Sequence, residues 1–430
     1  MNILIVGNGG REHALSWKIK QGKHCGKLFV SPGNAGTSLV AVNVAIGVND
    51  FPRLGSFCLE NQIELVVVGP EGPLVNGLRD HFEADTKLQH ILLVGPGRAG
   101  AQLEGSKDFS KQFMLRNGIP TAKARTFTAD QMDKALDYLK SCTPPVVLKA
   151  DGLAGGKGVV ISPSIAEAQA ALRGMLEEKK FGAASDKVLV EEFLPGIEVS
   201  VFVLTDGKDY VILPEAKDYK RIGEGDTGPN TGGMGAVSPV VFANPAFMRK
   251  VEEKVIRPTV SGLQKENIPY KGFIFIGLMN VKGEPFVIEY NARLGDPETE
   301  VVLPRIRNDF LDLLTATARG ELGGLTVEQE NFCAVTVVLA SGGYPGDYQT
   351  GKVISGLGKS ENTLVFHAGT RLHGGNVVTD GGRVLTVTGI GKDLQEASGE
   401  AYGAISGIGW DHLYFRKDIG LDLQRWKDEP

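Results

Sequence analysis

A glycine-rich loop lies between two short apolar runs in residues 146–162, VVLKADGLAGGKGVVIS. Glycine loops that carry lysine often bring the backbone close to phosphate. A Walker A loop requires GxxxxGK[ST] with a helix after it, but here Gly158 follows Lys157 and the run VVIS predicts a second strand. The segment therefore predicts a β-hairpin whose glycine tip closes over a ligand and binds phosphate through backbone N–H groups and lysine side chains.

Helix signals surround this hairpin. Capping boxes at Thr128 and Ser164 predict a helix on each side, so that a compact α+β module spans roughly 120–194. Upstream, Ser106 predicts the N-cap of another helix, which puts Lys107 in the first turn. The helix dipole disfavours a cation there, so a nearby bound anion would stabilise it. A solvated surface lysine is the alternative.

Four apolar runs in the first hundred residues each end in a glycine or proline loop: ILIVGNGG, KLFVSPGNAG, ELVVVGPEGP and ILLVGPGRAG. Helix-like segments separate them, which predicts an open α/β sheet of parallel strands with ligands at the carboxyl ends. Gly7 and Gly9 fit the start of a dinucleotide-binding GxGxxG, but Glu12 replaces the third glycine, and the second strand ends in Ser31 and Pro32 instead of an acidic residue. We therefore expect a smaller phosphate at this turn, or a turn without a ligand.

Carboxylates follow the hairpin module at Glu191, Glu192 and Glu198. Next to a nucleotide they can hydrogen-bond ribose hydroxyls or an exocyclic amine, although glutamates are more often simply solvated. Their place directly after the predicted lid favours the nucleotide interpretation.

Residues 272–298, GFIFIGLMNVKGEPFVIEYNARLGDPE, predict a second hairpin that turns at Lys282 and Gly283. The period of two along a strand puts Glu289, Asn291 and Arg293 on one face. Two oxygen ligands beside a guanidinium suit magnesium that bridges nucleotide phosphates, with the arginine stabilising a transferred phosphoryl group. A polar face exposed to water is the alternative.

A second glycine-rich segment, AKDYKRIGEGDTGPNTGGMGAVSP, holds six glycines between Gly223 and Gly235. A disordered linker is one interpretation. The segment lies between predicted strands and carries prolines without serine-rich filler, which favours a long ordered loop, and such loops are usually functional.

Composition limits the possible classes of protein. With 430 residues the chain predicts roughly three domains, and 42% hydrophobic with 23% charged residues are typical of a globular protein. A net charge of −5 argues against a nucleic-acid partner, and no apolar run is long enough for a membrane helix. Four scattered cysteines and a start without a basic leader predict a reduced, cytoplasmic protein without a zinc or disulfide framework.

Six motifs together resemble the ATP-grasp superfamily and, within it, the glycinamide ribonucleotide synthetase family. They are GNGGREHAL, LEGSKDF, KADGLAGGKGV, DTGPNTGGMGA, NARLGDPETE and SGGYPGDY, in the order of that family and across essentially the whole chain. TGPNTGGMG together with RLGDPE is highly specific, and the glycine loop alone is moderately so.

The resemblance implies a mixed α/β and α+β fold in three parts. An open parallel sheet domain would span residues 1–103, and an ATP-grasp domain would span 104–325, with a mobile lid subdomain at about 122–193. A strand-rich mixed domain would occupy 326–430 and end in a helix-like segment after Lys392.

The resemblance also implies the residues of the site. Its ATP-binding positions correspond to Lys107, Lys149, Asp151, Gly152, Gly155, Gly156, Lys157, Gly158, Glu191, Glu192, Phe193, Leu194 and Glu198. Its substrate-binding positions correspond to Asn8, Gly9, Gly10, Lys220, Asp226, Thr227, Gly228, Pro229, Asn230, Thr231, Gly232, Gly233, Met234, Arg293, Gly295, Asp296 and Pro297. Catalytic roles would fall to Arg293, Lys149 and Asp296, and Glu289 and Asn291 would bind Mg²⁺ or Mn²⁺.

The implied activity is an ATP-dependent ligation of glycine to 5-phosphoribosylamine through glycyl phosphate, in purine biosynthesis, by a cytoplasmic monomer. Phosphoryl transfer of this kind needs positioning and charge neutralisation more than a protein nucleophile. Three alternatives stay open. Another ATP-grasp enzyme could join a different acid and amine or carboxylate a purine precursor, a nucleotide sensor could keep the loop without turnover, and a dehydrogenase would need the missing third glycine.

Overall fold

Five parallel strands form the N-terminal sheet of the computed structural model, which describes residues 1–153, 158–358 and 362–424. In spatial order the strands are β3 (Val42–Asn43), β2 (Leu28–Pro32), β1 (Ile3–Gly7), β4 (Leu65–Val68) and β5 (Leu92–Val94). Its helices are α1 (Gly10–Ile19), α2 (Phe51–Glu60), α3 (Glu71–Val75), α4 (Leu78–Ala84) and α5 (Arg98–Gly105). Strands β1 and β4 are buried along their whole length, as parallel strands covered on both faces require. The predicted open α/β sheet is confirmed.

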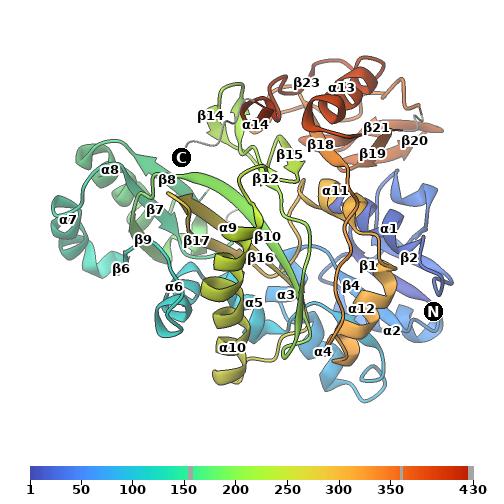
Figure 1. The fold of residues 1–430 in the computed structure, drawn as a ribbon, viewed down its shortest axis with the longest axis horizontal. Coiled ribbons are helices and arrows are strands. Elements are labelled where there is room, and N and C mark those ends of the chain that lie inside the picture. The colour runs from blue at the N-terminus through green and yellow to red at the C-terminus, as the bar shows by residue number, and fades with distance from the viewer. Residues whose placement is uncertain (154–157, 359–361, 425–430) are drawn as a thin grey trace.

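The hairpin predicted around the glycine loop consists of β7 (Val146–Ala150) and β8 (Val159–Ser162), which pair antiparallel. It belongs to a four-stranded sheet, in the order β6-β9-β7-β8, with β6 (Ala124–Thr128) and β9 (Lys187–Glu192). Helices α7 (Met132–Lys140) and α8 (Ile165–Leu176) cover this sheet. We call these six elements the lid module, which lies at the side of the molecule away from the N-terminal sheet (Figure 1).

The predicted helix caps are present. Ser106 accepts a hydrogen bond from the N–H of Phe109 (3.1 Å) at the start of α6 (Lys107–Arg116), and Ser164 accepts one from Glu167 (3.2 Å) at the start of α8. The capping box of Thr128 opens a 3₁₀ turn over 129–131 that leads into α7. The cap thus acts one turn before the α-helix itself.

A central antiparallel sheet lies between the lid module and the N-terminal sheet (Figure 1). Its order is β11 (Tyr210–Ile212), β10 (Ile197–Thr205), β16 (Gly272–Val281) and β17 (Glu284–Asn291). Helices α9 (Pro245–Val251) and α10 (Arg257–Lys265) share a buried cluster with it, in which Val251 and Leu263 meet Val201 and Ile276. The hairpin β16–β17 turns at Lys282 and Gly283 as predicted, and a bulge at Ile288 separates the pair Leu278–Val287 from Gly277–Glu289.

The C-terminal sheet combines strands from two regions of the chain. Its order is β12 (Lys217–Asp218), β15 (Gly235–Ser238), β18 (Cys333–Ser341), β22 (Arg383–Gly391) and β19 (Thr363–His367), and β23 (Leu413–Tyr414) pairs with β18. Two hairpins stand apart from this sheet: β13 (Arg221–Gly223) with β14 (Thr227–Asn230), and β20 (Thr370–His373) with β21 (Asn376–Thr379). The remaining α-helices are α11 (Thr299–Val302), α12 (Phe310–Arg319), α13 (Leu394–Ile405) and α14 (Leu421–Gln424). The glycine-rich segment is therefore built into this sheet at both of its ends, through β12 and β15.

Among the helices in the described ranges, none is both long enough and apolar enough to span a lipid bilayer.

Candidate functional site

A cavity of about 920 Å³ lies where the lid module, the central sheet and the second glycine-rich segment meet. The lid module contributes Lys149 from β7 and Glu191 from β9. The central sheet contributes Glu289 and Asn291 from β17. The cavity is large enough for a nucleotide together with a small substrate.

Two lysines bracket the buried carboxylate of Glu191. Lys149 Nζ lies 2.7 Å from Glu191 Oε2, and Lys111 Nζ lies 2.9 Å from Oε1. Burial would raise the pKa of Glu191, but the charges of Lys149 and Lys111 lower it on balance. Lys149 also donates to the carbonyl of Ile288, the bulge residue of β17 (2.8 Å). The side chain of Glu191 therefore orients Lys149 in the cavity.

Lys107 links α6 to the loop that follows β7, because its Nζ donates to Gly152 O (2.9 Å). Burial lowers the pKa of Lys107, although the charge of Glu289 acts to raise it. The carboxylate of Asp151 turns toward the same helix and accepts hydrogen bonds from Ser106 Oγ (3.0 Å) and Asp108 N (3.1 Å). Asp151 thus stabilises the N-terminus of α6, while Lys107 and Gly152 line the cavity.

Glu289 and Asn291 lie on the same side of β17, as the period of two predicts. In the orientation that its hydrogen-bond partners favour, the amide nitrogen of Asn291 donates to Glu104 Oε1 (3.0 Å). The amide oxygen of Asn291 then faces away from that carboxylate. Burial would raise the pKa of Glu289, but the positive charges of Lys220 and Lys149 lower it on balance, and Lys220 has the larger effect. An ionised carboxylate and an amide oxygen are ligands that suit Mg²⁺ when substrate phosphates supply the others. Within the described residues no group of three or more His, Cys, Asp or Glu side chains forms a metal cluster of its own.

Arg293 lies just beyond the end of β17 and is fixed by two carboxylates. Its Nη2 lies 2.8 Å from Glu104 Oε1, and its Nε lies 3.3 Å from Glu71 Oε2. Glu71 begins α3 and Glu104 lies in α5, so the N-terminal part of the chain holds this guanidinium against the cavity.

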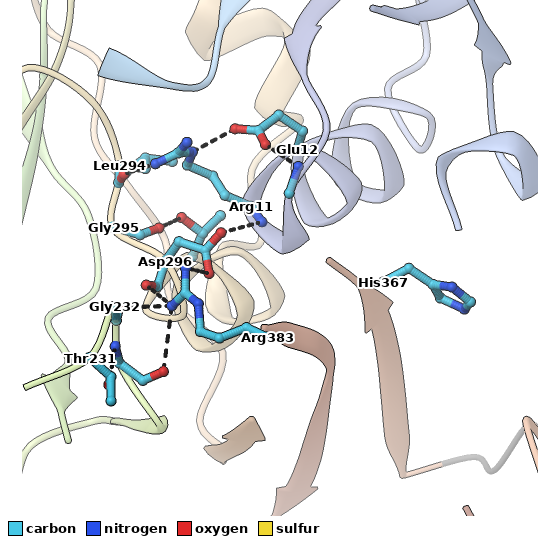
Figure 2. A network of polar contacts seen from close by, with 12 residues as sticks. Arg11, Glu12, Thr231, Gly232, Leu294, Gly295, Asp296, His367 and Arg383 are labelled. Atoms are coloured by element: carbon cyan, nitrogen blue, oxygen red, sulfur yellow. Dashed lines mark hydrogen bonds and ion pairs between the residues drawn. The ribbon is translucent and has the colours of Figure 1, made fainter. Parts of the chain in front are cut away.

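A polar network joins Asp296 to both ends of the chain (Figure 2). Arg383 of β22 reaches Asp296 Oδ1 (3.1 Å) and donates to Gly232 O (2.7 Å). Arg11 donates its backbone N–H to Asp296 Oδ2 (3.3 Å), and its Nη1 donates to Leu294 O (3.0 Å). Burial would raise the pKa of Asp296, but the charges of Arg383 and Arg11 lower it. Asp296 is therefore an anion that ties α1 and β22 to the site.

The second glycine-rich segment is ordered. Thr231 donates to Lys220 O (2.8 Å) and accepts from Gly233 N (2.9 Å). Gly233 has φ +116°, and a Cβ there would lie 2.5 Å from Pro297, so only glycine allows this close packing. Asp226 at the hairpin turn pairs with the buried Arg416 (2.7 Å). The disordered-linker alternative is wrong.

The predicted residues of this segment lie in different places. Those that line the cavity are Lys220, Asp226, Asn230, Thr231 and Gly232. Met234 is fully buried in a small core cluster. The side chains of Thr227 and Pro229, and Gly228 between them, are exposed on strand β14.

The turn after β1 lies beside Asp296. Gly9 donates its N–H to Glu12 Oε2 (2.6 Å), and a Cβ at Gly10 would lie 2.4 Å from Glu300 Oε1. Asn8 lines a smaller cavity of about 220 Å³ with Asn34 and Thr370. The turn thus borders the large cavity through Arg11 and Asp296.

The remaining predicted nucleotide residues lie at the end of β9, on β10 and in the glycine loop before β8. Residues 191–194 line the cavity, although Glu192 also accepts from Lys123 N (2.8 Å). Glu198 on β10 pairs with Lys220 (2.7 Å). Gly158 lines the cavity, whereas Gly155, Gly156 and Lys157 lie outside the described residues.

Sequence reasoning missed several charged residues of the site. Lys111 follows Lys107 by one helical turn on α6, and this spacing could have predicted that both lysines lie on the same face of the helix. Arg11 stands inside the first motif, next to the predicted glycines. Arg383 lies 87 residues from Asp296, and Arg416 lies 190 residues from Asp226, so neither contact has a local signal, although Arg416 also pairs with the nearby Asp418.

Models of one family match three parts of the chain. They are described as the phosphoribosylglycinamide synthetase N domain (residues 1–104), ATP-grasp (A) domain (105–299) and C domain (334–422). The chain is 46% identical over 426 residues to the phosphoribosylamine–glycine ligase of Escherichia coli K12, covering 98% of both chains. It is 47% identical over 428 residues to the ligase of the same name from Chlorobaculum tepidum, covering 98% of this chain and 99% of the relative.

Solved structures agree. The crystal structure of phosphoribosylamine–glycine ligase from Thermotoga maritima superposes with a TM-score of 0.83 at 35% identity, covering 97% of this chain and 100% of that chain. A biotin carboxylase–β-γ-ATP complex from Campylobacter jejuni has a TM-score of 0.74 at 15% identity, covering 99% of this chain and 95% of that chain. This likeness shows a shared fold. These matches show that the chain belongs to the phosphoribosylglycinamide synthetase family and has an ATP-grasp domain.

Proposed function

We propose that this chain is an ATP-dependent ligase that joins glycine to 5-phosphoribosylamine through glycyl phosphate. The products would be glycinamide ribonucleotide, ADP and phosphate, in de novo purine biosynthesis. The observation that supports this most directly is the grouping of Lys107, Lys149, Glu289 and Arg293 around one cavity beside the glycine hairpin. Relatives that match over nearly their whole length are named for this activity.

The reaction needs a carboxylate that is a poor acyl donor to become activated. Attack of the glycine carboxylate on the γ-phosphorus of ATP gives an acyl phosphate and ADP, and Lys107 and Lys149 would hold the phosphates during this transfer. Arg293 would stabilise charge on the transferred group. The amine of phosphoribosylamine then attacks the acyl carbon, phosphate leaves and an amide forms. Closure of the lid module would exclude water from the acyl phosphate.

Glu289 and Asn291 would hold Mg²⁺ or Mn²⁺, which neutralises phosphate charge when bound. Asp296 would act by holding Arg383 and the N–H of Arg11 in place, as its contacts allow. Residues 191–194 and Glu198 would bind the adenosine part, and the lining residues of the second glycine-rich segment would bind the other substrates.

We further propose that the three parts of the chain, 1–103, 104–325 with its lid at about 122–193, and 326–430, act together in a cytoplasmic monomer. The three ranges that the family models match support this division.

The activity is tested by ADP release in the presence of Mg²⁺, glycine and freshly prepared phosphoribosylamine. We expect release that depends on both substrates and an amide product that contains glycine. The matched control omits glycine only. Release that is equal with and without glycine would refute the ligase proposal, and stimulation by a different acid would point to another ATP-grasp ligase.

A further inference from the structure

Glu104 is a buried carboxylate that reaches the end of β17 from a distant part of the chain. It lies in α5, within the motif LEGSKDF, and is 7% exposed. The backbone N–H of Ala292 donates to its Oε2 (2.8 Å). Its Oε1 lies 2.8 Å from Arg293 Nη2 and 3.0 Å from the amide nitrogen of Asn291. One carboxylate thus accepts from three consecutive residues.

The amide of Asn291 can lie in two orientations, and its surroundings decide between them. Its nitrogen faces Glu104 Oε1 and the backbone carbonyl of Tyr290 (3.2 Å). Both of these atoms are acceptors, and an ionised carboxylate has no hydrogen to donate. The amide oxygen is therefore available to a ligand in the cavity that Asn291 and Glu289 both line.

A divalent cation at this place requires the oxygen. Mg²⁺ and Mn²⁺ prefer oxygen ligands, whereas the amide nitrogen carries two hydrogens with partial positive charge. Residues that hydrogen-bond a metal ligand fix the atom that it presents, and their loss typically weakens metal binding by about 10- to 100-fold. The contacts of Glu104 with Asn291 are of this kind.

We propose that Glu104 is a positioning residue that holds the amide of Asn291 with its oxygen toward the metal. The same Oε1 atom binds Arg293, so the metal ligand and the arginine that would stabilise the phosphoryl group are held at one fixed separation. The inference rests on the proposed ligase function with its divalent metal. It adds the residue that orients two groups of that site from the N-terminal part of the chain.

Glu104→Gln tests the orientation directly. Glutamine keeps the shape of the side chain but offers one acceptor oxygen where glutamate offers two. If that oxygen keeps the N–H of Ala292, the new amide nitrogen faces Asn291 and favours the reversed amide. We expect the Mn²⁺ affinity of the protein saturated with ADP to fall by about 10- to 100-fold, as electron paramagnetic resonance of bound and free Mn²⁺ would show.

The matched control is Glu71→Gln. Glu71 also pairs with Arg293, at Nε (3.3 Å), but within the described ranges it has no hydrogen bond with Asn291. This variant should lower kcat and leave Mn²⁺ affinity unchanged. Equal losses of Mn²⁺ affinity in the two variants would trace the effect to the charge beside Arg293 and would overturn the proposal.

A second substitution at the metal ligand gives a sharper result. Asn291→Asp presents an oxygen in either orientation, and its other oxygen can accept from the glutamine of Glu104→Gln. In that background it should restore Mn²⁺ affinity, whereas in the wild-type background it places two carboxylates together and should gain less. Equal gains in the two backgrounds would mean that the two positions act independently, and they would contradict the orienting role.

If Glu104→Gln does not fold, as circular dichroism would show, Glu104→Asp carries the same comparison. It keeps the charge and draws the carboxylate back by one methylene, so it should weaken Mn²⁺ binding, and unchanged binding would refute the proposal. These binding measurements need no turnover. A wild-type protein that binds Mn²⁺ and ADP, with the expected effect of Glu104→Gln, but releases no ADP from ATP with glycine would refute the ligase function alone.

Discussion

At the scale of single residues, the site depends on pairs that hold one functional group in place. Glu191 fixes Lys149, Glu104 fixes Arg293, and Asp296 joins Arg383 to the start of α1. Each of these side chains is oriented by a partner from a different element. Positioning of this kind is what phosphoryl transfer requires of a protein.

Glu289→Ala should abolish turnover and leave the fold intact. Glu289 lines the cavity and would be a metal ligand, so its loss removes charge stabilisation and not core packing. We expect kcat to fall by about 10²–10³-fold or more, with little change in Tm.

The matched control is Glu284→Ala, on the same strand. Glu284 is partly exposed and pairs with Lys250 and Lys254 away from the cavity, so it should keep full activity. Full activity in Glu289→Ala would contradict the metal assignment.

At the scale of elements, a C-terminal segment that carries Tyr414 and Arg416 holds the hairpin β13–β14 in place. Arg416, which is 1% exposed, lies 2.7 Å from Asp226 and 2.7 Å from Asp418, and it donates to Arg221 O (3.1 Å). Tyr414 donates to Ile222 O in the same hairpin (2.7 Å). The position of the hairpin β13–β14 therefore depends on residues almost 200 positions later in the chain.

Arg416→Met should loosen this hairpin. Removing the guanidinium takes the ion-pair partner from Asp418 and the donor from Arg221 O, so we expect the free energy of unfolding to fall by about 1–3 kcal/mol. We also expect KM for glycine or phosphoribosylamine to rise more than KM for ATP, as steady-state kinetics would show.

The control for this variant is Arg307→Met, which removes an exposed arginine whose ion pairs are 3.8 Å long. It should change neither stability nor KM appreciably. Equal increases in KM for ATP and for the other substrates in Arg416→Met would argue against a local role for Arg416.

At the scale of the whole molecule, the N-terminal and C-terminal parts meet at two buried histidines. His13 of α1 accepts a hydrogen bond at Nδ1 from the backbone N–H of His367 in β19 (2.8 Å), and their ring centroids are 5.6 Å apart. Burial lowers the pKa of His13 to about 3, with a further contribution from His367, and burial lowers the pKa of His367 to about 4. Both rings are therefore neutral in the folded protein at neutral pH.

Acid should weaken this contact. The unfolded histidines have a pKa of about 6.5, so the unfolded chain binds protons that the folded chain excludes. The stabilising contribution is complete above pH ~6.5, and it falls by up to ~1.4 kcal/mol per pH unit for each histidine as the pH decreases toward the folded values. Melting temperatures between pH 7 and pH 5 would measure this slope.

His13→Gln is the informative variant, since it removes one titrating group from the contact. It should have a lower Tm at pH 7, because the ring packs edge-on against Phe366, but a shallower loss of Tm with acid. A slope equal to that of the wild type would show that other groups cause the acid sensitivity.

Sequence patterns predicted the features that are local. The parallel sheet, the hairpin around 146–162 and the shared side of Glu289 and Asn291 follow from strand period and turn residues within one segment. The roles of Arg383 and Arg416 could not be predicted, because they depend on contacts between distant segments.

The strands β12 and β15 flank the second glycine-rich segment, and β15 hydrogen-bonds along β18 in the C-terminal sheet. A protein engineer who exchanged the last hundred residues for those of another ATP-grasp enzyme would remove the neighbour on which β15 is hydrogen-bonded. Under the proposed substrate-binding role of this segment, such a chimera would need a redesigned pairing between β15 and β18 to keep the substrate preference.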